Sequence, residues 1–231
     1  MSWGRAHRRA HRPRTSCSPP EGEDRTSDAP EARRRSWRHG AAAARHLRHG
    51  TADRERLTEL IRGAGIAVVV DIRTAPGSRH NPDAGRERLR QWLPEAGVAY
   101  RWEPRLGGFR KVPADSPDTV WRNDAFRGYA AHTRTDEFLD AITQLLDEAA
   151  GRRTAVMCAE AVWWRCHRRI VADFVELARE RPVLHLMPDG RLVPHRLSEG
   201  VRLREDGLLV YDGRRSSDRP GEGRAQSGRG T

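Results

Sequence analysis

The chain has 231 residues, of which 32% are charged and only 6% aromatic, and its formal net charge at pH 7 is +11. This charge lies mostly at the ends: residues 1–50 hold 12 Arg against 5 acidic residues, whereas residues 51–212 are nearly balanced. The basic composition alone therefore does not indicate nucleic-acid binding. The first 20 residues lack the apolar run of a secretory signal, and no segment is apolar enough to span a membrane, so we expect a cytoplasmic protein without membrane contact.

The two ends differ in composition from the middle of the chain. Residues 1–44 mix arginine, histidine, serine, proline and acidic residues without a hydrophobic period, and residues 213–231 are rich in glycine, serine and arginine. Neither segment can bury enough apolar surface to offset the conformational entropy lost on folding. We therefore expect disordered tails at both ends and a single domain at 45–212.

The first half of this domain is predicted to alternate helix with strand. Thr51 can cap a first helix, which precedes an apolar strand at 67–72. Asp83 can cap a second helix, which precedes an alternating strand at 98–102. The residues expected on the buried faces of these two helices are Leu57, Leu60, Ile61, Leu89, Trp92 and Leu93.

The second half continues the alternation. Thr135 opens a helix that leads to a strand at 154–158, and a further helix begins near Cys166. Short strands are predicted at 183–186 and 208–211. Strands that alternate with helices, two of them continuously apolar, predict an α/β fold with three layers, in which a mostly parallel sheet is flanked by helices.

Polar residues cluster in two of the predicted strand-to-helix loops, at 71–82 and 158–169. In an open parallel sheet, ligands bind where such loops converge at the carboxyl ends of the strands. If the two strands are neighbours, the two loops face each other. The candidate site residues in these loops are Asp71, Arg73, Ser78, Asn81, Cys158, Glu160, Arg165, Cys166, His167 and Arg168.

The arginines of the second loop indicate the class of ligand. They stand near a helix start, where free backbone N–H groups and the helix dipole attract an anion, so a phosphate or carboxylate is expected there. The alternative is that these arginines only form a solvated first turn. Both interpretations stay open at this point.

The segment 103–134 has no clear hydrophobic period, and we expect it to lie across the site. Gly107 and Gly108 allow a close approach between backbone and ligand. Its aromatic residues can stack on a base or ring, or they can be ordinary covering hydrophobes. The candidate ligand-binding residues of this segment are Gly107, Gly108, Arg122, Asn123, Phe126 and Tyr129.

Five motifs in order, DIRTAPGSRHNP, a tyrosine-bearing strand leading to LGG, WRNDAFRGYA, MCAE and WRCHR, resemble the bacterial family of domains of unknown function numbered 488. The resemblance runs from about Arg48 to Asp212. Two positions depart from the family pattern: Trp163 stands where proline is usual, and Arg48 where glycine is usual. The resemblance implies no reaction, because the role of the family is not established. The matching positions are Asp71, Arg73, Pro76, Ser78, Tyr100, Gly107, Gly108, Phe126, Tyr129, Cys158, Glu160, Cys166, His167 and Arg168.

The first functional hypothesis is an enzyme that acts on a phosphate-bearing substrate such as a nucleotide or a nucleic acid, with hydrolysis as the candidate reaction. Asp71 or Glu160 would be the general acid or base, and His167 would transfer a proton. Cys158 is the candidate nucleophile, although the short loop from cysteine to arginine of thiol phosphatases is absent. Its alternative role is that of a small packing residue. The arginines that would bind the anion are Arg73, Arg165 and Arg168.

Other functions fit the same residues. Cys158, Cys166, His167 and Glu160 offer zinc ligands, and the two cysteines offer a redox pair, but their spacing matches no standard zinc pattern. We therefore expect no cofactor, with zinc as the alternative; NAD is not expected, since no glycine fingerprint follows the first strand. A second class is a module that binds a nucleotide or nucleic acid without turnover, and a third is a structural protein without a ligand. The oligomeric state is not predictable from the sequence.

Overall fold

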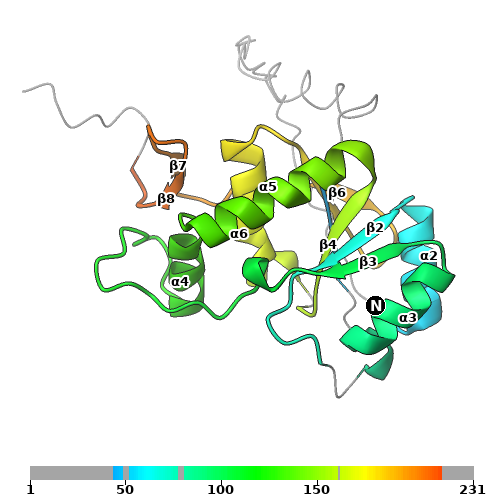
Figure 1. The fold of residues 1–231 in the computed structure, drawn as a ribbon. Coiled ribbons are helices and arrows are strands. Elements are labelled where there is room, and N and C mark those ends of the chain that lie inside the picture. Colours follow the sequence, from blue (N-terminus) through cyan, green and yellow to red (C-terminus); the bar gives the residue numbers. More distant parts are fainter. Residues whose placement is uncertain (1–43, 49–51, 78–80, 161, 215–231) are drawn as a thin grey trace, which may run out of the picture.

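The computed structural model describes residues 44–48, 52–77, 81–160 and 162–214 (Figure 1). The predicted tails at 1–44 and 213–231 fall almost entirely outside these residues, so their predicted disorder stays a prediction. No helix in the described part of the chain combines the length and the apolar character needed to cross a membrane.

Within the described residues, six strands form one sheet in the order β3-β2-β4-β1-β5-β6. The pairs from β3 to β5 are parallel, and β6 runs antiparallel to β5. A separate antiparallel pair is formed by β7 and β8. The bounds are β1 (Ala44–Arg48), β2 (Val68–Asp71), β3 (Ala99–Trp102), β4 (Thr154–Cys158), β5 (Val183–Leu186), β6 (Leu192–Pro194), β7 (Val201–Leu203) and β8 (Leu209–Tyr211).

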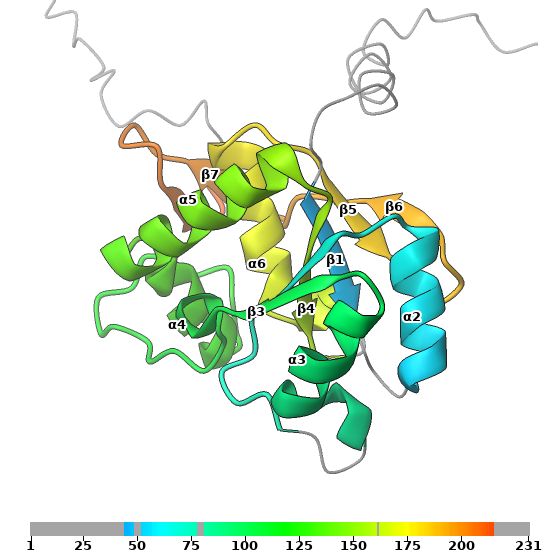
Figure 2. The same ribbon diagram turned by 45° about the vertical axis from the view of Figure 1, so that its right-hand side comes forward.

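Helices cover both faces of the sheet, which confirms the predicted three-layer α/β fold (Figure 2). One face is covered by α2 (Arg54–Gly63) and α3 (Arg86–Glu95), whose predicted apolar residues are buried. The opposite face is covered by α4, α5 and α6, with the larger core cluster between them and the sheet. Their bounds, with those of the shorter turns, are α4 (Asp124–His132), α5 (Asp136–Gly151), α6 (Arg168–Asp173), the 3-10 turns η1 (Pro82–Ala84), η2 (Pro104–Leu106) and η3 (Trp163–Arg165), and the π-helical turn η4 (Phe174–Ala178).

The starts of two helices differ from prediction. The carboxylate of Asp53 caps α2 by accepting a backbone N–H at 2.8 Å, and Thr51 lies outside the described residues. Asp83 lies in η1 and does not cap α3, which instead begins after Gly85, a residue with no side chain to accept a hydrogen bond. Thr135 caps α5 as predicted, through its side-chain oxygen.

Three elements were not predicted in their observed form. The central strand β1 covers 44–48, where the sequence analysis placed only the end of the tail and the start of the domain. The segment 103–134, in which the sequence analysis recognised no hydrophobic period, contains α4. The strand predicted at 208–211 exists as β8 but pairs with β7 outside the main sheet. The sequence of β1, ARHLR, has no apolar run, because a histidine and arginines flank its one leucine.

Candidate functional site

The two predicted loops, after β2 and β4, begin next to each other at the same edge of the sheet. The two strands are parallel neighbours with Asp71 opposite Met157, and the next backbone N–H, that of Ile72, donates to the Met157 carbonyl at 3.0 Å. Because side chains alternate along a strand, Asp71 lies on the α2–α3 face with Met157, whereas Cys158 lies on the α4–α6 face. The loops are adjacent, but these two predicted catalytic side chains start on opposite faces of the sheet.

Asp71 forms a buried ion pair with Arg73. Its carboxylate accepts the Arg73 backbone N–H at 3.1 Å, two guanidinium N–H groups and the Tyr100 hydroxyl at 2.8 Å. Burial alone would lower the pKa of Arg73, but the hydrogen bond and charge of Asp71 outweigh it and raise that pKa. Burial, with the charge of Asp71, also raises the pKa of Tyr100. Through these contacts Asp71 and Arg73 stabilise the start of the loop after β2.

A cluster of thiols and imidazole lies at the end of β4. The Sγ atoms of Cys158 and Cys166 and a ring nitrogen of His167 all lie within 4.8 Å of one another. Both cysteines are buried and unbridged. Among the described residues, this is the one group of three or more His, Cys, Asp or Glu side chains arranged so that it could hold a metal ion.

Arg168 fixes this cluster from within the core. Its side chain is only 2% exposed. Its Nε donates to Cys166 Sγ at 3.3 Å, its Nη1 to the Leu47 carbonyl at 2.6 Å and its Nη2 to the Glu160 carbonyl at 2.8 Å. We expected Arg168 to bind a ligand anion, but its nitrogens instead connect β1, the loop after β4 and the start of α6. Its positive charge therefore lies directly beside the Cys166 sulfur.

The two thiols differ in acidity. The hydrogen bond from Cys158 lowers the pKa of Cys166; burial opposes this effect, and His167 and Arg168 lower the pKa further. The same hydrogen bond and burial raise the pKa of Cys158. The predicted nucleophile was Cys158, whereas the thiol whose pKa is lowered is Cys166, because the hydrogen bond from Cys158, and then His167 and Arg168, favour its thiolate.

The segment 103–134, which was predicted to lie across the site and is called the cover here, comes close to the thiol cluster at Gly108. His167 Nδ1 is 3.6 Å from Cys166 Sγ, and a Cβ placed on Gly108 would come within 3.1 Å of the same nitrogen. The Thr74 hydroxyl donates to the Gly108 carbonyl at 2.8 Å, which ties the cover to the loop after β2. At Gly107 a Cβ would come within 2.6 Å of the Thr74 hydroxyl and 2.8 Å of the Pro104 carbonyl, so this position requires glycine.

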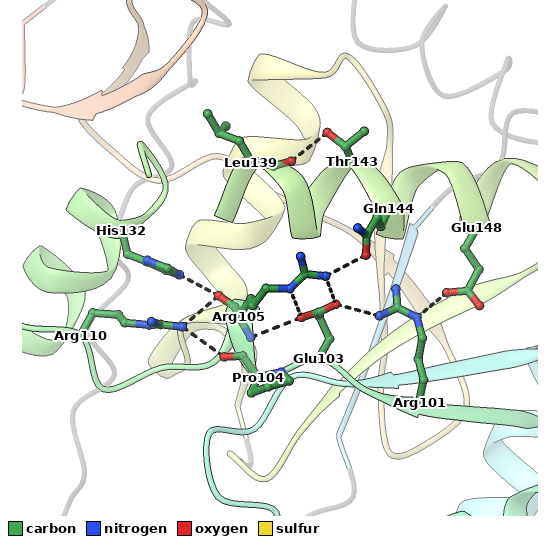
Figure 3. Close-up of polar contacts among 10 residues, drawn as sticks. All are labelled: Arg101, Glu103, Pro104, Arg105, Arg110, His132, Leu139, Thr143, Gln144 and Glu148. Carbon is green, nitrogen blue, oxygen red and sulfur yellow. Dashed lines mark hydrogen bonds and ion pairs between the residues drawn. The ribbon is translucent and has the colours of Figure 1, made fainter. Parts of the chain in front are cut away.

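A network of arginines holds this cover in place (Figure 3). The Glu103 carboxylate accepts hydrogen bonds from Arg105 at 2.8 Å and from Arg101 at 3.1 Å. Burial alone would raise the pKa of Glu103, but its bonds to Arg105 and the charge of Arg101 lower it. Arg110 and His132 donate to backbone oxygens of the cover, those of Pro104, Arg105 and Gly107.

The predicted aromatic residues of the cover pack internally. Tyr129 is fully buried and its hydroxyl donates to the Leu106 carbonyl at 2.7 Å. Its ring also packs against the imidazole of His167, with the ring centroids 4.9 Å apart. Phe126 stacks on Trp121, with the ring centroids 4.9 Å apart. These contacts match the alternative in which the aromatics are covering hydrophobes.

The remaining predicted residues are spread around the cluster. Asn123 caps α4, next to the exposed Arg122, and Asn81 donates to the Ala52 carbonyl. The side chains of Glu160 and Arg165 are exposed in the loop after β4. Ser78 lies outside the described residues. The structure thus brings together Cys158, Cys166, His167, Arg168, Gly107 and Gly108.

A second polar cluster was missed by the sequence analysis. His46 of β1 lies opposite His185 of β5, and a hydrogen-bond chain runs from His185 through His195 to Asp173 of α6. His185, inside the short apolar strand VLHL, was a signal for a buried polar site. Its neighbour His46 could be found only by recognising β1 as a strand.

The family comparison agrees with the resemblance seen in the motifs. A family model described as "Domain of unknown function DUF488" matches residues 53–175, a shorter stretch than the one predicted at 48–212. The matched segment contains both loops and the thiol cluster. Searches against curated proteins and against solved structures gave no match. Because the match covers more than half of the chain, the protein belongs to the DUF488 family.

Proposed function

We propose that the protein performs thiol–disulfide chemistry, with Cys166 as the nucleophile and Cys158 as the resolving thiol. The observation that carries this proposal is the environment of the Cys166 sulfur. Arg168 Nε lies 3.3 Å from it and His167 Nδ1 lies 3.6 Å from it. Cationic and hydrogen-bond-donating neighbours stabilise a thiolate, which is the reactive form of cysteine. The Cys158 sulfur lies within 4.8 Å of the Cys166 sulfur, close enough to form a disulfide with it during the exchange.

The proposed reaction has two steps. The Cys166 thiolate attacks one sulfur of a substrate disulfide, and the S–S bond breaks as the first substrate thiolate leaves. Cys158 then gives up its proton and attacks the Cys166 sulfur of the mixed disulfide, which releases the second substrate thiol. The protein ends with a Cys158–Cys166 disulfide and has lost two electrons to the substrate. His167, whose ring nitrogen lies within 4.8 Å of the Cys158 sulfur, is the proposed base for the Cys158 proton.

The predicted phosphate-bearing ligand has less support than the thiols. Arg73 is paired with Asp71, and Arg168 donates to two backbone carbonyls and a sulfur. Of the three arginines predicted to bind an anion, Arg165 has an exposed side chain. Binding of a nucleotide or nucleic acid therefore stays a prediction that depends on Arg165.

Alkylation with iodoacetamide tests the proposal. The experiment uses a Cys17→Ser background, because Cys17 is the third cysteine of the chain. At pH 7, peptide mass spectrometry should find Cys166 labelled faster than Cys158, and mild oxidation with diamide should give a Cys158–Cys166 disulfide. Arg168→Leu should slow the labelling of Cys166 by about tenfold or more, because it removes the adjacent positive charge.

Arg165→Leu is the matched control, since it removes an exposed arginine from the same loop. It should leave the labelling rate unchanged. The proposal fails if Cys166 reacts no faster than Cys158, or if diamide produces no bond between them in the folded protein.

The same cluster favours a second function, zinc binding. Three ligand atoms within 4.8 Å, from two cysteines and one histidine, match the protein ligands of a catalytic zinc site that keeps its fourth position open. Stoichiometric zinc that survives dialysis, is lost in Cys166→Ser and blocks alkylation would favour this function over dithiol exchange.

A further inference from the structure

The two most exposed large hydrophobic side chains in the described part of the chain stand on segments that contact the thiol cluster. They are Phe109 of the cover, which is 90% exposed, and Trp164 of η3, which is 46% exposed. Phe109 follows Gly108, whose backbone approaches the His167 ring, and Trp164 stands two residues before Cys166. Large apolar side chains left in water beside a reactive group indicate a surface that binds another molecule.

The backbone of Phe109 is strained. Its φ angle is +59°, in the left-handed region that a bulky residue rarely adopts and that glycine adopts readily. Its neighbours hold this turn: Thr74 donates to the Gly108 carbonyl at 2.8 Å, and Arg110 donates to the carbonyls of residues 104, 105 and 107 at 2.9–3.1 Å. Strain that the surrounding structure maintains is typical of active and binding sites. Phenylalanine at this position destabilises the fold and leaves its ring in water, which points to a contact outside the chain.

Cations accompany both aromatic side chains. Arg165 directly follows the exposed tryptophan, and Lys111 lies two residues after the exposed phenylalanine. Both cations are exposed, and neither forms an ion pair within the described residues. The nearest exposed acids of the same two segments, Asp115 and Glu160, stand four and five residues away in the sequence. This surface is therefore complementary to a partner that carries apolar and acidic side chains.

We propose that the disulfide substrate of this site is a polypeptide in which apolar residues stand next to the cysteine and acidic residues stand beyond them. Phe109 and Trp164 bind the apolar side chains, and Lys111 and Arg165 attract the acidic ones. The strained backbone at Phe109 is retained because its ring contacts the substrate. This inference rests on the proposed thiol–disulfide function, since it names the substrate of the same site.

Reduction of peptide disulfides by the reduced full chain, in the Cys17→Ser background, tests the proposal in a single turnover. Three homodisulfides are compared, each made of a peptide with a central cysteine: Glu-Leu-Cys-Leu-Glu, Glu-Ser-Cys-Ser-Glu and Lys-Leu-Cys-Leu-Lys. Each reaction releases two peptide thiols, which mass spectrometry measures, and leaves the protein with the Cys158–Cys166 disulfide. Each rate is divided by the rate with dithiothreitol, which removes differences in the intrinsic reactivity of the peptides.

The first peptide should react at least about tenfold faster than the second, because its leucine side chains leave water on binding. It should also react faster than the third, by a margin that added salt reduces. A lysine peptide that reacts as fast as the glutamate peptide would contradict the acidic part of the assignment.

Phe109→Gly removes the ring and the strain together. It should abolish most of the preference for leucine over serine, while the melting temperature stays the same or rises, since glycine adopts a positive φ without strain. If the ring only stabilised the cover, its removal would lower the melting temperature and leave the preference intact. Leu203→Ser is the matched control, because it removes an exposed apolar side chain from β7, outside both segments. It should leave all three rates unchanged.

The outcomes separate this proposal from the function on which it rests. If bis(2-hydroxyethyl) disulfide is reduced but the three peptides react alike, the thiol function stands and the polypeptide substrate is wrong. If neither this disulfide nor any peptide is reduced, both fail. A single-stranded oligonucleotide that blocks the reaction, with no preference among the peptides, would assign Phe109 and Trp164 to base stacking and overturn the proposal. The peptide comparison leaves the site unchanged, so it decides even if a variant does not fold.

Discussion

Two places in the same sheet treat buried polar groups in opposite ways. At the end of β2, the Asp71 carboxylate accepts four hydrogen bonds, from Arg73 and Tyr100, and a full charge is matched by an opposite charge. On β1 and β5, His46 and His185 lie equally deep, yet three of their four ring nitrogens have no partner in the described structure. One place is electrostatically complete without a ligand, and the other is not.

The two places therefore differ in their role: paired groups stabilise the fold, whereas incompletely paired groups are the candidates for reactivity. A fully paired carboxylate holds its loop in one shape, and the cost of burying its charge is offset by its partner. Unpaired imidazole nitrogens keep the free-energy cost of their removal from water. Between the two lies Arg168, whose charge is balanced by no carboxylate among its hydrogen-bond partners and faces the Cys166 sulfur. The candidate reactive groups are thus those that the fold leaves incompletely matched.

Breaking the matched pair should have the largest effect. Asp71→Asn removes the negative charge and leaves the Arg73 guanidinium buried without its counter-ion, since the Arg73 side chain is 4% exposed. The expected loss in the free energy of unfolding is about 3–5 kcal/mol, measured by urea denaturation. A loss below about 1 kcal/mol would show that Arg73 finds another partner and that the pair does not hold the loop.

Lowering the pH should destabilise the protein through His46 and His185, the two incompletely paired histidines. Burial holds the pKa of His185 down to about 2 and that of His46 well below its usual range, so both are neutral when folded. Below pH 6.5 these histidines take up protons in the unfolded chain but not in the folded chain. The free energy of unfolding is therefore highest above that pH and decreases as the pH drops. Between pH 7 and 5 the loss is about 2 kcal/mol for His185, and His46 adds a loss in the same direction.

The variant His185→Phe isolates this effect. Urea denaturation at a series of pH values should show a loss between pH 7 and 5 that is smaller by about 2 kcal/mol than in the unchanged protein. An identical pH dependence in both proteins would mean that His185 is protonated in the folded state.

The smallest effect is expected at the surface. Arg54 and Glu95 form an ion pair at 2.9 Å, comparable in distance to the contacts of Asp71, but their side chains are 46% and 63% exposed. Glu95→Gln should change the free energy of unfolding by less than about 1 kcal/mol, because water and salt screen this pair. The same urea measurement made beside Asp71→Asn isolates burial as the variable, and a change above about 2 kcal/mol would contradict that explanation.

The parts of the fold that could be predicted are those whose sequence carries its own signal. The strands β2 and β4 are apolar runs, and Thr135 has the oxygen that caps a helix. β1 was missed because its burial depends on neighbours more than 100 residues away, β4 and β5, and not on its own composition.

The site was predictable only to the level of its loops. Parallel pairing places the ends of β2 and β4 together, which the alternation of strands and helices predicts. The register that sends Asp71 and Cys158 to opposite faces, and the direction of Arg168 toward Cys166, follow from pairing and helix orientation, which a single sequence does not contain.

The central position of β1 also has a consequence for synthesis. This strand leaves the ribosome first among the strands of the described residues, but its neighbours β4 and β5 begin only at residues 154 and 183. At typical rates of translation β1 waits roughly 5 to 20 seconds before β4 exists. During that interval a strand rich in valine or isoleucine would invite aggregation. The charged sequence ARHLR, which made β1 difficult to recognise from the sequence, lacks the apolar run that promotes such aggregation.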